Sequence, residues 1–473
     1  MNVAVGMVRR VCHAPYDRRC SNASRPSAVG RSSRANGRER TTMRKSFRGV
    51  GPSTAVCLIC TACFAASPAA AYTPGGTRHA HPLRSAPALP AVTVQPTANG
   101  GDQADALQAA FDALQPGQRL VLAPGRYAVS RSLTVSKADV VISGYGATLV
   151  ATNPADQTIV MSGSGSTLVG VTLVGTGTTR LTTVESTKVE VTGAGVQVLG
   201  VTIQGGASAG IFVYGGRNVA IVGNTVQATL ADGIHTTHGS TNVLVRGNTV
   251  KDTGDDLIAV VSYQADGSLS ANVLIDGNTV SGNYWGRGIS VVGGRSVTIS
   301  NNSVHGVQKA AGILVAQEDS WKTYGVSDVV IENNVVGAIQ DGTNANNGLQ
   351  PTQQAAIELD TWSGTVSYVV VKGNRVSGSG YAGFRALGNV CHFSVADTTL
   401  ASIAGIPVWL LTNNCPAADI VAYGNSLGGV ALAPPVGASP SGTIPAGGAV
   451  TSGMPAVRTS LMQANGALAS ARH

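Results

Sequence analysis

Short stretches of alternating apolar and polar positions recur along the middle of the chain. Asn242-Val-Leu-Val-Arg246 and Asn272-Val-Leu-Ile-Asp276 are examples, and a period of two residues is typical of β-strands. Each stretch leads into a phrase such as Gly-Asn-Thr-Val, and no helical periodicity separates the copies. The closest copies lie 24 residues apart. The recurring Asn of the phrase stands at Asn224, Asn248, Asn278, Asn302, Asn334 and Asn374.

A repeat of this length with two or three short strands and no helix describes one coil of a right-handed parallel β-helix. Such coils stack at roughly 4.8 Å and share a core, because one coil cannot bury its own apolar face. We therefore expect an all-β solenoid over residues 100–430. The repeated Asn has a structural explanation, since it tolerates the left-handed backbone of a tight turn and can hydrogen-bond its copy in the next coil.

The two ends of the solenoid are predicted to differ from its middle. Ala106–Leu114 has apolar residues at helical spacing and is followed by Pro116-Gly117, which predicts a short helix that closes the open N-terminal end. Residues 72–99 are interpreted as a linker. Residues 431–473 are rich in Ala, Gly, Pro and Ser, so we expect a poorly ordered, low-complexity tail.

The coils can be aligned on the short strand that follows each turn. An Ile recurs there and is expected in the core, at Ile211, Ile234, Ile258, Ile289 and Ile313. Two positions earlier lies a second column, which reads Ala209, Asp232, Asp256, Arg287 and Ala311. Parity puts this column on the same face as the Ile column, so the strand must turn there for the side chains to reach water.

Asp232 and Asp256 are therefore expected on adjacent coils, roughly 5 Å apart at the backbone, where two carboxylates repel each other. Asp255 adds a third carboxylate, and Arg287 is the nearby cation of the column. Such a cluster should hold at least one acid with a raised pKa, as two-carboxylate glycoside hydrolysis requires. The alternative is that these acids are turn residues on a solvated surface.

The segment around these acids resembles the catalytic stretch of β-helical glycoside hydrolases. Ala231-Asp-Gly-Ile-His235 and Asp252-Thr-Gly-Asp-Asp-Leu-Ile-Ala259 are similar to the paired motifs of family 87 α-1,3-glucanases, and the family 28 polygalacturonases have a related trio. The resemblance implies an exported, polysaccharide-degrading, inverting hydrolase. It also implies that Asp255 is the general acid and that Asp232 and Asp256 activate water.

The sequence departs from the family 28 pattern one coil later. Gly286-Arg-Gly-Ile-Ser290 has Arg287 where that family has a histidine, and Ala311-Gly-Ile313 stands where it has Arg-Ile-Lys. The motif match covers about residues 230–290 and the match in fold about residues 95–430. The resemblance is therefore better evidence for the superfamily and for hydrolase chemistry than for the identity of the substrate.

Residues near the acids could bind a sugar chain. Basic side chains could hold an acidic sugar and tryptophans could stack on sugar rings, although each could equally be a turn residue or a loop anchor. The candidate substrate-binding residues are His235, His238, Lys251, Arg287, Trp285 and Trp321. No metal constellation, Ser-His-Asp arrangement or phosphate-cradling glycine loop is recognisable, so we expect no cofactor and a polysaccharide as the partner.

Two other functions remain open at this point. A β-helical polysaccharide lyase or epimerase would use Arg287 or a lysine as a base, commonly with calcium. A non-catalytic surface module would keep the fold and the sugar contacts without turnover.

Charge is unevenly distributed along the chain. Residues 1–71 hold twelve Lys or Arg and two acids, although the whole chain has a formal net charge of only +8. The rest is slightly acidic, which excludes the basic footprint of a nucleic-acid binder. Residues 43–71 have the basic, apolar and small-residue order of a signal peptide, and residues 1–42 are interpreted as a non-native upstream extension. We expect a secreted or periplasmic monomer without a stable membrane anchor.

Cysteine usage agrees with export. Five of the seven cysteines lie in residues 1–71, which leaves Cys391 and Cys415 in the mature region. In an oxidising compartment we expect these two to form a disulfide, with two buried free thiols as the alternative.

Overall fold

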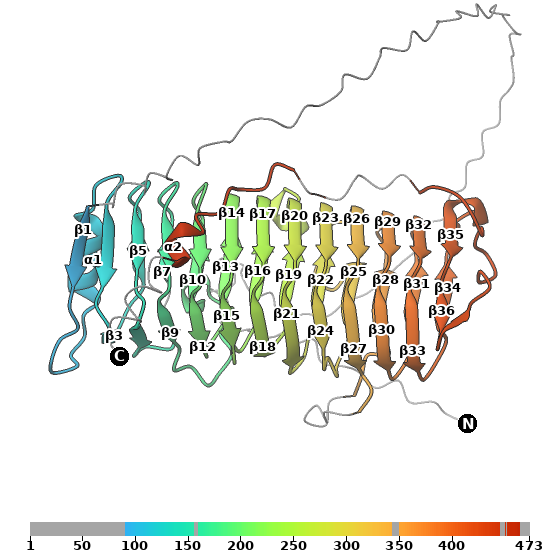
Figure 1. Ribbon diagram of the computed structural model, residues 1–473, viewed down its shortest axis with the longest axis horizontal. Helices are drawn as coiled ribbons and strands as arrows, with labels where there is room; N and C mark the ends of the chain where they lie inside the picture. Colours follow the sequence, from blue (N-terminus) through green and yellow to red (C-terminus); the bar gives the residue numbers. More distant parts are fainter. Residues whose placement is uncertain (1–89, 156–158, 343–349, 445–449, 451, 464–473) are drawn as a thin grey trace, which may run out of the picture. The chain divides into compact units, whose positions relative to one another are not determined.

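The computed structural model describes residues 90–155, 159–342, 350–444, 450 and 452–463. The predicted upstream extension and signal peptide lie outside the described residues, as does the predicted linker up to residue 89. Three long β-sheets, here called A, B and C, run along the solenoid, and most coils add one strand to each sheet (Figure 1). The fold is the predicted all-β parallel β-helix.

Sheet A contains β1 (Ala91–Val94), β2 (Arg119–Leu122), β5 (Val141–Ser143), β8 (Thr167–Val169), β11 (Gln197–Leu199), β14 (Arg217–Val222), β17 (Thr241–Arg246), β20 (Ala271–Asp276), β23 (Gly294–Ser300), β26 (Val326–Glu332), β29 (Val366–Lys372), β32 (Val390–Ala396) and β35 (Ile420–Tyr423). Sheet B contains β3 (Gly125–Val129), β6 (Ala147–Ala151), β9 (Thr172–Val174), β12 (Thr202–Gln204), β15 (Thr225–Gln227), β18 (Thr249–Thr253), β21 (Thr279–Asn283), β24 (Ser303–His305), β27 (Val335–Ile339), β30 (Arg375–Ser379), β33 (Thr399–Ile403), β36 (Ser426–Leu427) and β37 (Val430–Ala431). Sheet C contains β4 (Leu133–Val135), β7 (Ile159–Met161), β10 (Val189–Val191), β13 (Ile211–Tyr214), β16 (Ile234–Thr237), β19 (Ile258–Val261), β22 (Ile289–Val292), β25 (Ile313–Gln317), β28 (Ile357–Thr361), β31 (Phe384–Gly388) and β34 (Val408–Thr412). The helices are α1 (Ala104–Asp112) and α2 (Ser460–Gln463), with 3-10 turns η1 (Val184–Ser186), η2 (Gln264–Asp266) and η3 (Ala417–Asp419).

The turn from sheet A to sheet B carries the repeated Asn. Asn248 is buried, and its Nδ2 donates to Oδ1 of Asn278 at 2.9 Å and to the carbonyl of Ile221 at 3.0 Å. The same bonds recur along the column, so the predicted amide ladder is present. The left-handed residue, however, is the one before the ladder Asn, with φ of 61° at Gly247 and 57° at Asn301. The Asn therefore recurs for its hydrogen bonds and not for its backbone tolerance.

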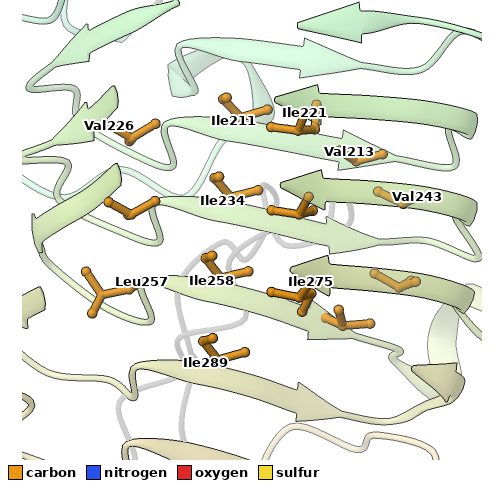
Figure 2. Close-up of a cluster of buried hydrophobic side chains, with 14 of the residues drawn as sticks. Ile211, Val213, Ile221, Val226, Ile234, Val243, Leu257, Ile258, Ile275 and Ile289 are labelled. Carbon is orange, nitrogen blue, oxygen red and sulfur yellow. The ribbon is translucent and has the colours of Figure 1, made fainter. Parts of the chain in front are cut away.

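The predicted Ile column forms the inner face of sheet C. Ile211, Ile234, Ile258 and Ile289 pair in register on consecutive strands and point into the core (Figure 2). All four are essentially unexposed. Because side chains alternate along a strand, the residues between these inward positions face outward from sheet C, and they form the floor of the candidate site.

The N-terminal end begins earlier than expected. The predicted helix forms at Ala104–Asp112, where Leu107 and Phe111 are buried in the main core. Strand β1 pairs in parallel with β2, so the solenoid already includes residues that the sequence assigns to a linker. That α1 shields the end of the stack stays a prediction.

The described part of the C-terminal tail makes specific contacts with the solenoid. Residues 450 and 452–463, here called the C-terminal strap, lie on the outer face of sheet A. The backbone N–H of Val450 donates to Thr298 Oγ1 at 2.7 Å, and the Gln197 side chain bonds the backbone of Ala456 and Arg458 at 2.9 Å. Low-complexity composition hides this role, because the apolar partners of the strap lie in strands far away in sequence.

The apolar contacts of the strap form a small separate cluster. Buried residues of β5, β8 and β11 contact Leu461 and Met462, and Tyr145 Oη donates to the carbonyl of Leu461 at 3.0 Å. In the part of the chain that the structure describes, no helix combines the length and the apolar character needed to cross a bilayer.

Candidate active site

The turns from sheet B to sheet C carry the predicted acids. Asp232 lies between β15 and β16, and Asp255 and Asp256 lie in the next turn, between β18 and β19. The backbone N–H of Gly233 donates to the carbonyl of Asp256 at 3.0 Å, and that of Leu257 donates to the carbonyl of Arg287 at 3.0 Å. The predicted column of two acids followed by one cation is therefore in register in the structure.

Asp232 is paired with a histidine on its own coil. His235 Nδ1 lies 2.5 Å from Asp232 Oδ2, and the His235 side chain is 4% exposed. The imidazole faces outward from β16 and packs 5.1 Å from the ring of Phe212 on the preceding coil. His235, predicted as a substrate contact, is thus a buried partner of the Asp232 carboxylate.

Asp256 is the most buried of the three acids. Its Oδ1 accepts a hydrogen bond from the backbone N–H of Arg287, and its Oδ2 accepts one from Ser290 Oγ, both at 2.5 Å. Burial raises the pKa of Asp256 to about 7, and the negative charges of Asp255 and Asp232 act in the same direction against the pull of Arg287. A carboxyl group with this pKa can exchange a proton near neutral pH.

Asp255 lies beside Asp256 but has a different partner. Arg180 Nη2 donates to Asp255 Oδ2 at 2.7 Å. Burial, with a further contribution from Asp232, raises the pKa of Asp255 despite this arginine. A Cβ added at Gly286 would lie 2.2 Å from Oδ1 of Asp256 and 2.6 Å from Oδ1 of Asp255. The two carboxylates therefore flank one point on the next coil, and only glycine leaves that point open.

Arg287 joins the acids to further carboxylates on sheet C. Its Nη1 lies 3.9 Å from Asp256 Oδ1, and its Nη2 donates to Glu318 Oε1. Burial opposes the charged form, but Glu318, Asp256 and Asp255 together raise the pKa of Arg287 above its ordinary value. The guanidinium group therefore stays charged at any working pH.

A second buried ion pair lies farther along the same face. Glu358 of β28 and Arg385 of β31 are register partners on the outer side of sheet C, with Arg385 Nε 2.7 Å from Glu358 Oε1. Burial raises the pKa of Glu358 to about 7 in spite of Arg385. The Arg385 guanidinium carbon lies 5.3 Å from the ring of Tyr381 and 5.9 Å from that of Trp409. Asp360, half-buried on the same strand as Glu358, also has a pKa raised by burial.

The predicted tryptophan contacts lie on both rims of sheet C. Trp285 is next to Gly286 in the turn before β22 and is 48% exposed, with Lys309 Nζ 4.7 Å from its ring. Trp321 lies beyond the other end of the sheet, in the turn after β25, and is 37% exposed. Both rings are partly exposed, and of the two only Trp285 lies next to a residue, Gly286, that approaches the acids.

Two other predicted contacts lie away from the acids. His238 follows the far end of β16, where its ring stacks 4.0 Å from Tyr214 and its Nδ1 lies 3.1 Å from Asp266 Oδ1. Lys251 belongs to sheet B, between Gln227 and Ser281 on the neighbouring strands. Among the described residues, the acids contact Arg180, His235 and Arg287, whereas no ion pair links them to Lys251.

Sequence reasoning missed several residues of this face. Arg180 belongs to a loop 75 residues before Asp255, and Glu318 follows β25 outside the repeat, so no repeat position points to either. Ser290 directly follows Ile289 of the Ile column, so the alignment of the coils could have identified it. Glu358 and Arg385 could have been found by continuing the coil alignment past β25, because both follow the same inward position.

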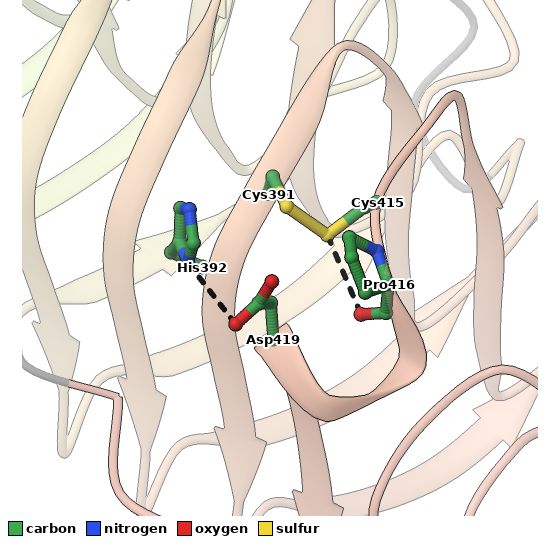
Figure 3. Close-up of a disulfide and its surroundings, with 5 residues drawn as sticks. All are labelled: Cys391, His392, Cys415, Pro416 and Asp419. Carbon is green, nitrogen blue, oxygen red and sulfur yellow. Dashed lines mark hydrogen bonds and ion pairs between the residues drawn. A yellow bond between two sulfur atoms is a disulfide. The ribbon is translucent and has the colours of Figure 1, made fainter. Parts of the chain in front are cut away.

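The candidate acids do not form a compact metal site. Within the described ranges, one group of three His, Cys, Asp or Glu side chains has ligand atoms within 4.8 Å of one another, namely Cys391, His392 and Asp419. Cys391 is bonded to Cys415 in a disulfide, and His392 Nδ1 lies 3.4 Å from Asp419 Oδ1 (Figure 3). A disulfide sulfur is not the thiolate that binds metals, so these three residues do not fit a metal ion.

Comparisons with known proteins agree on the fold. The family model described as "Right handed beta helix region" matches residues 151–304 and 262–400. No curated protein matches the chain. A solved catalytic domain of GH87 α-1,3-glucanase in complex with nigerose is similar with a TM-score of 0.54 and 15% identity, covering 73% of this chain and 70% of that chain.

Two further solved structures are similar. The catalytic unit of a thermostable GH87 α-1,3-glucanase from Streptomyces thermodiastaticus strain HF3-3 has a TM-score of 0.50 and 17% identity, covering 69% of this chain and 66% of that chain. The A-module of a mannuronan C-5 epimerase from Azotobacter vinelandii has a TM-score of 0.45 and 18% identity, covering 71% of this chain and 96% of that chain.

Proposed function

Because the chain belongs to the family of right-handed β-helix proteins, we propose that it is an exported glycoside hydrolase that cleaves a neutral polysaccharide with inversion. The observation that carries this proposal is the convergence of three carboxyl groups from adjacent coils, of which Asp255 and Asp256 have raised pKa values. Acid and base groups that share protons near neutral pH are what glycosidic hydrolysis requires.

The proposed step is a single displacement at the anomeric carbon. Asp255 gives its proton to the glycosidic oxygen as the bond between that oxygen and the anomeric carbon breaks. A water molecule forms the new bond to the carbon and loses a proton to Asp232 or Asp256. Because Asp255 and Asp256 interact, they titrate as a pair, and two neighbouring carboxyl groups with raised pKa values can divide into an acid and a base.

The charge of the face favours a neutral substrate. Three arginines on and beside sheet C, Arg180, Arg287 and Arg385, each contact a carboxylate already. The positive charge of these arginines is therefore already balanced, so it offers little attraction to a polyanionic chain. The likeness of the fold to α-1,3-glucanase catalytic domains makes an α-1,3-glucan the first substrate to test.

The lyase or epimerase alternative would need a base on this face. Arg287 is unsuited to that role, because its neighbouring carboxylates raise its pKa and hold it protonated. Lys251 lies on sheet B and not on this face. The non-catalytic alternative leaves the raised pKa values of Asp255 and Asp256 without a function.

The test is release of reducing ends from α-1,3-glucan, other neutral α-glucans, polygalacturonate and alginate. We expect the wild type to hydrolyse a neutral glucan and Asp255→Asn to lose roughly 10²–10⁴-fold in rate. Asp252→Asn is the matched control, because this exposed carboxylate lies on the same coil. An unsaturated product absorbing in the ultraviolet would support a lyase instead, and binding without turnover would support the non-catalytic module.

A further inference from the structure

The side chain of Arg180 binds one oxygen of the proposed general acid. Its Nη2 donates to Asp255 Oδ2 at 2.7 Å. The Arg180 side chain is 39% exposed and the Asp255 side chain is 22% exposed, so the guanidinium group is the more accessible half of this ion pair. A ligand that approaches Asp255 from solvent therefore meets Arg180 at Oδ2.

The loop that carries Arg180 has a backbone attachment of its own. It joins β9 to β10 and covers residues 175–188. The backbone N–H of Leu181 donates to the carbonyl of Ala207 on the next coil at 2.7 Å. The Arg180 side chain can therefore move away from Asp255 while the loop keeps this attachment.

The second oxygen of Asp255 is turned toward the next coil. A Cβ built on Gly286 would lie 2.6 Å from Asp255 Oδ1, so no sugar ring fits between the two residues. The backbone carbonyl of Asp255 accepts from Thr253 Oγ1 at 2.7 Å and from Asn283 Nδ2 at 3.2 Å, which holds the residue in this orientation. Oδ2 is therefore the oxygen that a glycosidic oxygen can reach, and it is the oxygen that Arg180 binds.

The charged groups that act on Asp255 come from separate elements. They are Asp232 on the preceding coil, Asp256 beside it, Arg287 on the next coil and Arg180 from the loop. Asp232 is paired with His235 at 2.5 Å, and Arg287 with Glu318. Of these groups, Arg180 is the one that belongs to an insertion and not to the stacked turns.

The contact with Arg180 opposes the work of a general acid, which must carry a proton before it can give one. A guanidinium group has no acceptor for such a proton, and its charge favours the carboxylate form. Burial and the charge of Asp232 raise the pKa of Asp255, whereas Arg180 and Arg287 lower it. Departure of Arg180 would therefore raise the pKa of Asp255 further, so that the carboxylate takes up a proton.

We propose that the substrate displaces Arg180 from Asp255, and that this displacement lets Asp255 take up the proton that it gives to the glycosidic oxygen. This inference rests on the proposed function, and it makes Arg180 a positioning residue, because it acts through Asp255. The proton comes from solvent when the substrate binds. It leaves with the departing sugar oxygen, while the attacking water bonds to the anomeric carbon and loses its own proton to Asp232 or Asp256.

The first experiment measures the pKa of Asp255 in the free full-length protein, by ¹³C NMR of its carboxyl carbon, assigned with Asp255→Asn. Arg180→Ala should raise this pKa by roughly 1–3, the usual effect of removing an opposite charge at hydrogen-bond distance. Arg217→Ala is the matched control, because it removes the same charge from an exposed position on sheet A, and it should leave the pKa unchanged. Equal values for Arg180→Ala and the wild type would overturn this inference and leave the proposed function intact, since no turnover is involved.

The second experiment compares pH profiles of α-1,3-glucan hydrolysis. The alkaline limb of kcat/KM reports loss of the proton from the general acid in the free enzyme, and that of kcat reports its loss in the complex. Arg180→Ala should move the alkaline limb of kcat/KM to higher pH by roughly 1–3 and leave that of kcat in place, because the substrate has already displaced Arg180 in the complex. Arg217→Ala should match the wild type in both profiles.

Two kinetic outcomes would contradict the displacement of Arg180. Equal movement of both limbs would show that Arg180 stays on Asp255 during turnover, and no movement of either limb would show that it does not control the proton. Absence of hydrolysis by the wild type on every glycan of the panel would overturn the proposed function and this inference with it, whatever the NMR titration gives.

Discussion

Asp256 should weaken the fold at neutral pH, and Asp256→Asn should strengthen it. The carboxylate is buried, and burial raises its pKa from 3.8 to about 7. An amide fits the same place, because Oδ1 can still accept from the N–H of Arg287 and Nδ2 can donate to Ser290 Oγ. The substitution therefore replaces a buried titratable group by a neutral one without leaving a buried polar group unpaired.

The sign and the size of the stability change caused by Asp256→Asn follow from proton linkage. Between pH 3.8 and about 7 the folded protein retains a proton that the unfolded chain has released, so stability falls as pH rises through this window. Each pH unit between the two pKa values is worth about 1.4 kcal/mol, which gives an upper limit of about 4 kcal/mol. Because Asp255 shares the titration, we expect Asp256→Asn to gain about 1–3 kcal/mol at pH 8 and almost nothing at pH 4.

Urea unfolding of both proteins at pH 4 and pH 8 measures this difference directly. Asp276→Asn is a control of opposite sign: burial alone would raise the pKa of Asp276, but hydrogen bonds from Asn301 and Ser300, with Arg246, lower it. Its carboxylate stabilises the fold above the unfolded pKa, and this contribution is lost as pH falls through the folded pKa, so this variant should lose stability at pH 8. The same gain for Asp256→Asn at both pH values, or a loss at pH 8, would refute the reasoning.

Two further predictions concern the scaffold. Asn278→Ala removes the oxygen that accepts hydrogen bonds from the side chain and the backbone N–H of Asn248, and it leaves other buried groups unpaired. Urea unfolding should therefore show a decrease of about 2–5 kcal/mol in the free energy of unfolding. A decrease below about 1 kcal/mol would contradict the stabilising role of the Asn ladder. Removal of residues 450–473 should lower Tm and increase binding of a hydrophobic dye by uncovering Val141, Val169 and Leu199, without changing kcat, since the strap lies on sheet A. Unchanged dye binding would show that the strap does not cover this patch.

The sequence predicts those parts of the fold that repeat. The Gly-Asn phrase defines the coil, and the coil aligns the Ile column and the column with Asp232 and Asp256, all of which the structure places in register. This works because each coil adds nearly the same contacts as the one before. Position in the repeat therefore predicts position in space.

Parts that do not repeat could not be predicted in this way. Arg180 reaches Asp255 from an insertion, and the strap reaches sheet A from a low-complexity tail. The contacts of such segments depend on three-dimensional paths that no local pattern records. Arg287 is an intermediate case, since its column is visible in the sequence but its partner Glu318 is not.

The signs of charges within a column separate structural positions from functional ones. Neighbouring coils are about 4.8 Å apart, so any charged residue that recurs in a column lies next to its own copy. A neutral amide can recur without cost, as the ladder through Asn248 does, and opposite charges can alternate, as Glu358 and Arg385 do. Two acids in succession, as at Asp232 and Asp256, repel each other and reduce stability. Two neighbouring acids in one column are better explained by a role in proton transfer than by a role in folding. The Asn ladder in the turns from sheet A to sheet B offsets the loss of stability that their repulsion causes.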